Sequence, residues 1–191
     1  MVTALSALVA VCLTGCAPTL STTSSQWSAA DSQGETMATE TISIAALHCD
    51  VPMNWEDVSR SDATEMYPVA YSSTDKGGET STLRFSPDYH DATTVAEAVS
   101  QVSAPDEDAE TEHGITGSTM QPGQPYPGAV TARTAEHSFV TEAGTEMVRH
   151  WWFLQDEKTG TIYAVEFTGA DTDDSVALIE TIDSSIRLGD A

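Results

Sequence analysis

One segment restricts the fold more than any other. Residues 146–154 read EMVRHWWFL, and in an extended strand they place apolar side chains on both faces. Successive side chains of a strand point to opposite faces of the sheet. One face would carry Met147, Trp151 and Phe153, and the other Val148, Trp152 and Leu154. A strand that is apolar on both faces has to be covered on both, so the sequence predicts a sheet with a layer above it and another below it.

The neighbouring segments supply more strands of that sheet. Residues 129–140 and 161–168 also alternate in polarity, and only short connections separate them from 146–154. Short connections join antiparallel neighbours, which predicts a three-stranded meander. Earlier in the chain we expect a strand over 42–51, a hairpin formed by 68–73 and 81–85, and a short strand over 115–120.

Two helices are available to cover the sheet. The first is predicted over 91–102, where Thr94 and Glu97 form a capping-box pattern and Asp91 is an alternative N-cap. The second is predicted over 173–186. Its expected apolar stripe consists of Val176, Ile179, Ile182 and Ile186. The fold class that follows is α+β, a central antiparallel sheet with helices packed on its faces.

The chain begins with a different kind of segment. Residues 2–13 are an apolar run of 12 residues, too short to cross a bilayer permanently but typical of a secretory signal. The next residues, Leu13, Thr14, Gly15 and Cys16, resemble the lipobox of bacterial lipoproteins. The resemblance implies that Cys16 receives diacylglycerol and that the signal is cleaved just before it. The alternative is an ordinary signal with a cysteine there by chance. The missing basic residue at its start favours an earlier translation start.

The domain organisation follows from composition. Residues 1–15 are expected to be the signal peptide, 16–40 the lipidated cysteine with a disordered Ser/Thr-rich tether, and 41–191 a single α+β domain. Of the whole chain's net charge of −23, the domain carries −20, from 27 acidic and 7 basic residues. So few cations do not form a nucleic-acid groove, and we expect no nucleic acid as a partner.

The order of elements in 44–188 resembles the PsbP-like superfamily. The resemblance rests on residues 50–55, DVPMNW, which end the first strand, followed by a hairpin, a helix, a long meander and a last helix that ends in IDSSI at 182–186. That superfamily includes photosystem extrinsic proteins, a Ran-binding family and many actinobacterial lipoproteins. The resemblance implies an α-β-α sandwich used for binding or assembly, with no shared catalytic residues.

Sites that carry chemistry are few in this sequence. Common hydrolase, nucleotide-binding and zinc-protease motifs are absent, and we expect no catalytic residues, no metal site and no cofactor. On a strand, Cys49 faces away from His48 and Asp50, so it is expected to be a buried, inert thiol. The segment from Met120 to Gly128, which contains Tyr126, is a candidate recognition loop because it presents an aromatic residue among Pro and Gly.

These features together predict a lipoprotein at the extracytoplasmic face of the cell membrane. Its domain would be a non-catalytic module that binds a protein or a small ligand, with the membrane contact made through diacylglycerol on Cys16. The alternative is a cation-dependent or hydrolytic enzyme that uses acidic residues of the irregular segment 103–128, where residues 106–112 form an acidic run.

Overall fold

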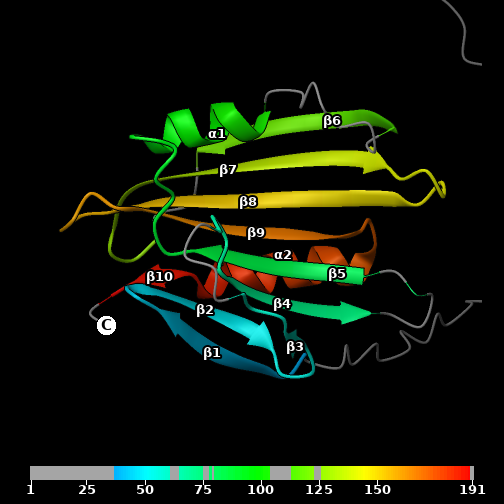
Figure 1. The fold of residues 1–191 in the computed structure, drawn as a ribbon, viewed down its shortest axis with the longest axis horizontal. Coiled ribbons are helices and arrows are strands. Elements are labelled where there is room, and N and C mark those ends of the chain that lie inside the picture. Colours follow the sequence, from blue (N-terminus) through cyan, green and yellow to red (C-terminus); the bar gives the residue numbers. More distant parts are fainter. Residues whose placement is uncertain are drawn as a thin grey trace, which may run out of the picture. The chain divides into compact units, whose positions relative to one another are not determined.

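The computed structural model describes residues 37–60, 65–74, 78, 80–103, 113–122 and 126–189 (Figure 1). The helices within these ranges are α1 (Val95–Ser103) and α2 (Asp173–Ser185). The first five strands are β1 (Thr39–Ile44), β2 (Leu47–Pro52), β3 (Glu56–Asp57), β4 (Val69–Thr74) and β5 (Thr80–Ser86). The others are β6 (His113–Pro122), β7 (Ala129–Val140), β8 (Glu146–Asp156), β9 (Ile162–Ala170) and β10 (Arg187–Leu188).

The strands form two antiparallel sheets. In the described part of the chain, the larger sheet has the order β3-β4-β5-β9-β8-β7-β6, and the smaller has the order β1-β2-β10. The predicted meander is confirmed, since β7, β8 and β9 are consecutive antiparallel neighbours. The predicted hairpin is confirmed as β4 and β5, and the other edge of β5 pairs with β9.

Each face of the larger sheet has its own core. On one face, Trp152 and Leu154 of β8 pack with Leu178 and Ile182 of α2, and the inner side of β2 joins them. On the opposite face, Trp151 and Phe153 pack with α1. The two-sided apolar pattern of β8 is therefore explained by one helix on each side, and the predicted α+β class with covered faces is confirmed (Figure 1).

Both helices begin with a threonine cap, and the one at α1 is the capping box that the sequence predicts. At α1, the Glu97 amide donates to the Thr94 hydroxyl over 3.1 Å, while the Glu97 carboxylate accepts from the Thr93 amide over 2.9 Å. Thr94 is therefore the cap, and Asp91 is not. At α2, the Ser175 amide donates to the Thr172 hydroxyl over 3.2 Å, and Asp173 and Asp174 lie in the first turn, where the helix dipole favours negative charge.

The expected strand over 42–51 is wrong. The chain there forms the hairpin β1–β2, whose turn contains Ala45 at φ 51° and Ala46. A left-handed alanine is uncommon, and neither residue is a usual turn former, so nothing in the sequence marks the reversal. β1 also begins at Thr39, inside the segment expected to be tether.

The expected apolar stripe of the second helix is also partly wrong. Val176 is 48% exposed, and the buried positions of α2 are Ser175, Leu178 and Ile182. The buried side of the helix therefore runs through Ser175, Leu178 and Ile182, and the inward-facing Ser175 hydroxyl donates to the Ala170 carbonyl over 2.6 Å.

Candidate binding site

A cluster of charged side chains lies on the α1 face of the sheet, on strands β5, β9 and β8. Arg84 pairs with Glu166 across β5 and β9, and Glu166 pairs with Trp151 across β9 and β8. Leu83 and Phe85 point into the core on the α2 side, so strand alternation places Arg84 on the α1 face. α1 packs mainly against β7 and β8, so Arg84 on β5 lies to the side of the strands that the helix covers most.

Glu166 is the centre of the cluster. Only 4% of the residue is exposed, yet its carboxylate is surrounded by donors. Arg84 donates to Oε1, and Trp151 Nε1 donates to Oε2 over 3.0 Å. Arg149 Nε lies 4.0 Å from Oε1, and the Thr168 hydroxyl lies 3.4 Å from it. A buried carboxylate needs such partners, so Glu166 is committed to holding the two arginines in place.

Arg84 is held from two sides but retains free donors. Its guanidinium carbon lies 5.0 Å from the centre of the Tyr67 ring, a cation–π contact, and Nη2 donates to Glu166. Burial, and secondarily the charge of Glu166, raises the pKa of Tyr67, so the ring stays neutral at physiological pH. Nε of Arg84 is buried without an acceptor, while 41% of the side chain is exposed.

A cavity of about 240 Å³ opens beside Arg84. The described residues that line it are Val58, Arg60, Glu65, Tyr67, Ala70, Thr82 and Arg84. At its rim Arg60 pairs with Glu65 over 3.7 Å, and the Arg60 side chain is 75% exposed. Of the five arginines of this acidic chain, three therefore belong to this cavity or to the adjoining cluster: Arg60, Arg84 and Arg149.

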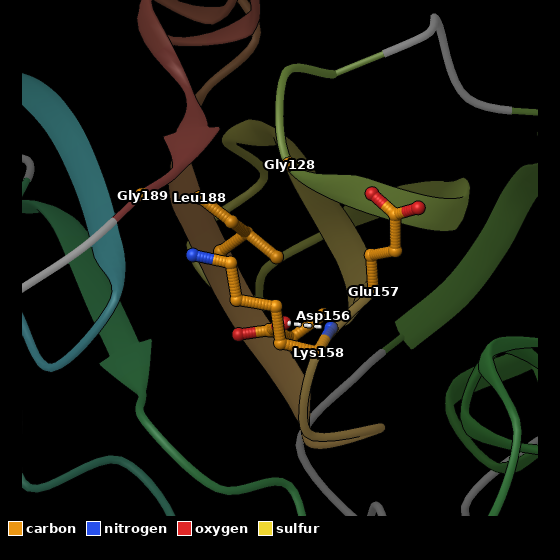
Figure 2. A pocket seen from close by; sticks show the side chains of 6 residues that line it. All are labelled: Gly128, Asp156, Glu157, Lys158, Leu188 and Gly189. Atoms are coloured by element: carbon orange, nitrogen blue, oxygen red, sulfur yellow. Dashed lines mark hydrogen bonds between the residues drawn. The ribbon is translucent and has the colours of Figure 1, made fainter.

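A second, smaller cavity of about 130 Å³ lies where β10 meets the start of β7. Figure 2 shows its lining, in which the Lys158 and Glu157 side chains extend in different directions. Two hydrogen bonds near this cavity hold the turn after β8 and the strand β10 in place. The Asp156 carboxylate accepts from the Lys158 amide over 2.6 Å, and Leu188 donates to the Pro127 carbonyl over 2.8 Å. We interpret this cavity as a structural junction of backbone segments.

Most of the sequence-predicted site residues lie outside the part of the chain that the structure describes. Leu13, Thr14, Gly15 and Cys16 lie outside the described residues, as does the acidic run 106–112. Met120 lies within β6, opposite Ala135 of β7.

The expectation of an exposed Tyr126 is wrong, because the residue is only 6% exposed. Its hydroxyl donates to Asp183 of α2, and Trp152 Nε1 donates to the same oxygen over 2.9 Å. A half-buried acceptor on α2 thus holds the ring against the core. The Pro and Gly residues nearby indicate a loop but not which way the ring points.

Cys49 is buried, as predicted. None of its surface is exposed, and its polar neighbours are the Asp50 carbonyl oxygen, 3.6 Å from Sγ, and the Ser185 hydroxyl, 3.9 Å from it. Burial raises the pKa of the thiol to about 12, so it remains protonated at neutral pH. His48 points elsewhere, with Nδ1 2.8 Å from the Ser43 hydroxyl, and Asp50 accepts from Thr41 over 2.5 Å. Within the described ranges, no three His, Cys, Asp or Glu side chains are grouped so that they could hold a metal.

The arginine cluster was not anticipated from the sequence. Its one visible signal is a charged residue inside an apolar strand, as at Arg84 between Leu83 and Phe85 and at Glu166 between Val165 and Phe167. That signal shows that each residue faces away from its neighbours, but only the register of β5 against β9 brings the two together.

The comparisons with known proteins concern the fold. The solution structure of cyanobacterial PsbP (CyanoP) from Synechocystis matches with a TM-score of 0.52 at 12% identity, over 82% of this chain and 96% of that one. The domain has the PsbP-like fold. The expected fold is thereby confirmed, and at this identity the likeness is one of fold alone.

Two other solved structures match with lower scores. LpqN of Mycobacterium tuberculosis, described as involved in cell envelope biogenesis, has a TM-score of 0.44 at 12% identity, over 82% of this chain and 87% of that one. The Ran-binding protein Mog1p of Saccharomyces cerevisiae has a TM-score of 0.46 at 12% identity, over 81% and 97%. No protein-family model matches the sequence, and no curated protein matches it.

Proposed function

We propose that this chain is a cell-envelope lipoprotein, anchored at the extracytoplasmic face of the membrane by diacylglycerol on Cys16, and that its PsbP-like domain is a non-catalytic binding or assembly module. The anchoring part rests on the apolar run 2–13 followed by Leu13, Thr14, Gly15 and Cys16. None of the helices in the described part of the chain is long and apolar enough to span a bilayer. A domain of net charge −20 is repelled by anionic headgroups, so two acyl chains would supply the attachment.

The observation that carries the binding role is the cavity beside Arg84. It lies beside the strands that α1 covers, and Arg84, which lines it, is held by Glu166 and by the Tyr67 ring. Groups held in place before a ligand arrives lose little conformational entropy on binding, which is a property of binding sites.

The non-catalytic role agrees with how the reactive groups are used. Glu166 accepts from Arg84 and Trp151 and is therefore committed as an acceptor rather than poised as a base. The Cys49 thiol has a raised pKa and no exposed surface, whereas a nucleophilic cysteine needs a thiolate that a substrate can reach.

The anchor is tested by metabolic labelling with an alkyne-tagged fatty acid. Wild type is expected to incorporate the label in the membrane fraction, and Cys16→Ser is expected to lose it. Cys12→Ser and Cys49→Ser are matched controls, because each removes a different thiol of the same chain. Both should keep the label. Label that survives in Cys16→Ser rejects the anchor.

The binding role is tested by capture from solubilised envelopes with the full chain as bait. A specific partner should be recovered with wild type and with Arg133→Gln, which removes an exposed arginine from β7. It should be depleted with Arg84→Gln. Equal recovery with both variants would argue against a binding role for the cavity face.

A further inference from the structure

We propose that the outer edge of β1 binds an extended segment of a partner protein as an added strand. The segment has alternating apolar and polar residues and a basic residue beside Glu40. This inference goes beyond the binding role of the cavity beside Arg84, and it depends neither on that cavity nor on the lipid at Cys16. It follows from three properties of β1: the regularity of its edge, the exposure of its isoleucines, and the charge at its start.

The first property is the regularity of the edge. In the part of the chain that the structure describes, the two sheets end in four strands, β1, β10, β3 and β6. β3 and β10 have two residues each; both residues of β3 are acidic, and Leu188 of β10 already donates to the Pro127 carbonyl. β6 is longer, but its pairing with β7 has two register shifts, and such bulges interrupt the ladder that an added strand would continue. These three edges are therefore protected.

β1 is longer than β3 and β10 and more regular than β6. Its six residues pair with β2 in unbroken register, from Thr39 opposite Pro52 to Ile44 opposite Leu47, and its sequence TETISI contains neither lysine nor proline. Among the described strands, β1 pairs with β2 alone and is the outermost strand of its sheet (Figure 1). The backbone groups of a strand point alternately toward its two neighbours. Every second residue of β1 therefore turns an N–H and a C=O toward the position that an added strand would occupy.

The second property is the exposure of Ile42 and Ile44. Both lie on the inner face of β1 and pack against the core on the α2 side, yet both are only half-buried. Their partners on β2, Cys49 and Leu47, are 0% and 1% exposed. Apolar residues opposite the two isoleucines on an added strand would remove this remaining apolar surface from water. Polar residues would alternate with them, because the outer face of β1 is polar.

The third property is the charge at the start of β1, where Glu40 is exposed. Burial raises the pKa of the Tyr71 hydroxyl, and the charges of Asp57, its partner across β3 and β4, and of Glu40 raise it further. The two carboxylates therefore lie near the same hydroxyl. A lysine or arginine beside Glu40 would offset their charge, whereas a second copy of this domain would bring another net charge of −20. A segment with a basic residue is thus favoured over a second β1.

The experiment titrates the mature lipidated chain in detergent micelles with synthetic peptides and follows backbone amide shifts and hydrogen exchange by NMR. The main probe is acetyl-Lys-Thr-Val-Thr-Val-Thr-Lys-amide, whose lysines and valines share one face of an extended strand. We expect saturable shifts at β1 and slower hydrogen exchange at alternate β1 amides. A peptide with glutamates in place of both lysines should bind at least about tenfold more weakly.

Two N-methylated peptides test the main-chain hydrogen bonds. One carries methyl groups on its valine nitrogens and the other on its threonine nitrogens, so each peptide is blocked along a different edge. Only the peptide whose blocked edge faces β1 should lose binding. Equal binding by the two N-methylated peptides overturns the proposal.

Charge reversal tests the role of Glu40. The variant Glu40→Lys should lose the preference for the lysine peptide, and its fold should be intact because Glu40 is exposed. Glu142→Lys makes the same change at an exposed position in the turn after β7, and it should keep the wild-type preference. An unchanged preference in Glu40→Lys contradicts the proposed basic residue of the partner.

Three further results would overturn the inference. The first is the absence of saturable shifts at β1. The second is a peptide-free dimer in sedimentation whose alternate β1 amides are protected, which assigns the edge to a second copy. The third is the same protection in a peptide-free monomer, which assigns the edge to other residues of this chain. Labelling at Cys16 and capture that depends on Arg84 test the proposed function separately, because neither residue belongs to β1.

Discussion

At the scale of single residues, Gly128 lies where the last strand passes the start of β7. Its φ is +80°, and a Cβ atom there would lie 2.1 Å from the Leu188 carbonyl oxygen. Gly144 has a similar φ of +85° in the turn between β7 and β8, but nothing lies within 4 Å of its Cβ position. The two glycines therefore share a backbone conformation and differ in the space around them.

We predict that Gly128→Ala destabilises the fold clearly more than Gly144→Ala. Both substitutions force an alanine into the left-handed region, which costs roughly 1–2 kcal/mol. Gly128→Ala must also displace β10, which adds roughly 1–3 kcal/mol by analogy with overpacked cores. Urea denaturation of the two variants measures the difference. Equal free energies of unfolding would show that the close approach of Leu188 has no energetic effect.

The Glu136–His150 pair gives a pH-dependent prediction. His150 Nδ1 lies 3.1 Å from the Glu136 carboxylate, and this hydrogen bond is the largest cause that lowers the pKa of Glu136 below its usual 4.5. A carboxyl whose pKa is lower in the folded state than in the unfolded state stabilises the fold above its unfolded pKa, and this contribution is lost as the pH falls through the folded value.

Glu136→Gln should therefore lower stability at pH 7, and the deficit should be smaller at pH 3, because this contribution is lost as the carboxyl becomes protonated. The free energy of unfolding from urea titrations at both pH values provides the measurement. Glu142→Gln, in the turn after β7, is the control for a simple loss of negative charge. A deficit of the same size at both pH values would mean that the carboxylate charge is not what stabilises the pair.

The arginine cluster could be predicted from the sequence only in part. Alternation along single strands is readable, so it could have been deduced that Arg84 and Glu166 point to the opposite face from their apolar neighbours in the chain. Their convergence depends on β5 pairing with β9, which are separated in the chain by α1 and three other strands. No local pattern encodes that pairing, and for this reason the cluster required the structure.

At the scale of elements, local patterns were sufficient where they were long and regular. The predicted range 129–140 coincides with β7, and the second helix was predicted to within a residue of α2 (Asp173–Ser185). The failures were short or lacked turn residues. β3 and β10 have two residues each, and the β1–β2 turn uses Ala45 in a conformation that alanine seldom adopts.

Two substitutions test which side of α2 faces the core. Leu178 is 4% exposed and Val176 is 48% exposed, although the sequence-based stripe included only Val176 of the two. We predict that Leu178→Ala costs about 2–5 kcal/mol and Val176→Ala less than about 1 kcal/mol, because only the first leaves a cavity in the core. Denaturant midpoints with unchanged slopes provide the comparison. Similar losses for the two variants would contradict the observed rotation of the helix.

At the scale of the whole molecule, the two faces of the larger sheet have different roles. The α2 face is closed by the helix and the smaller sheet, whose side chains include Val51 and Leu188. The α1 face is closed beside Phe153 but open beside Arg84. The covered α2 face contributes the larger part of the core, and the cavity beside Arg84 is the part of the sheet that supports the proposed binding role.

The central claim is that a lipid on Cys16 anchors this domain at the extracytoplasmic face of the membrane. Intact mass spectrometry of the protein extracted from the membrane fraction tests it most directly. The account predicts a mature chain whose first residue is Cys16, with the added mass of diacylglycerol. A chain that retains residues 1–15, or one that begins at Cys16 without lipid, would contradict it.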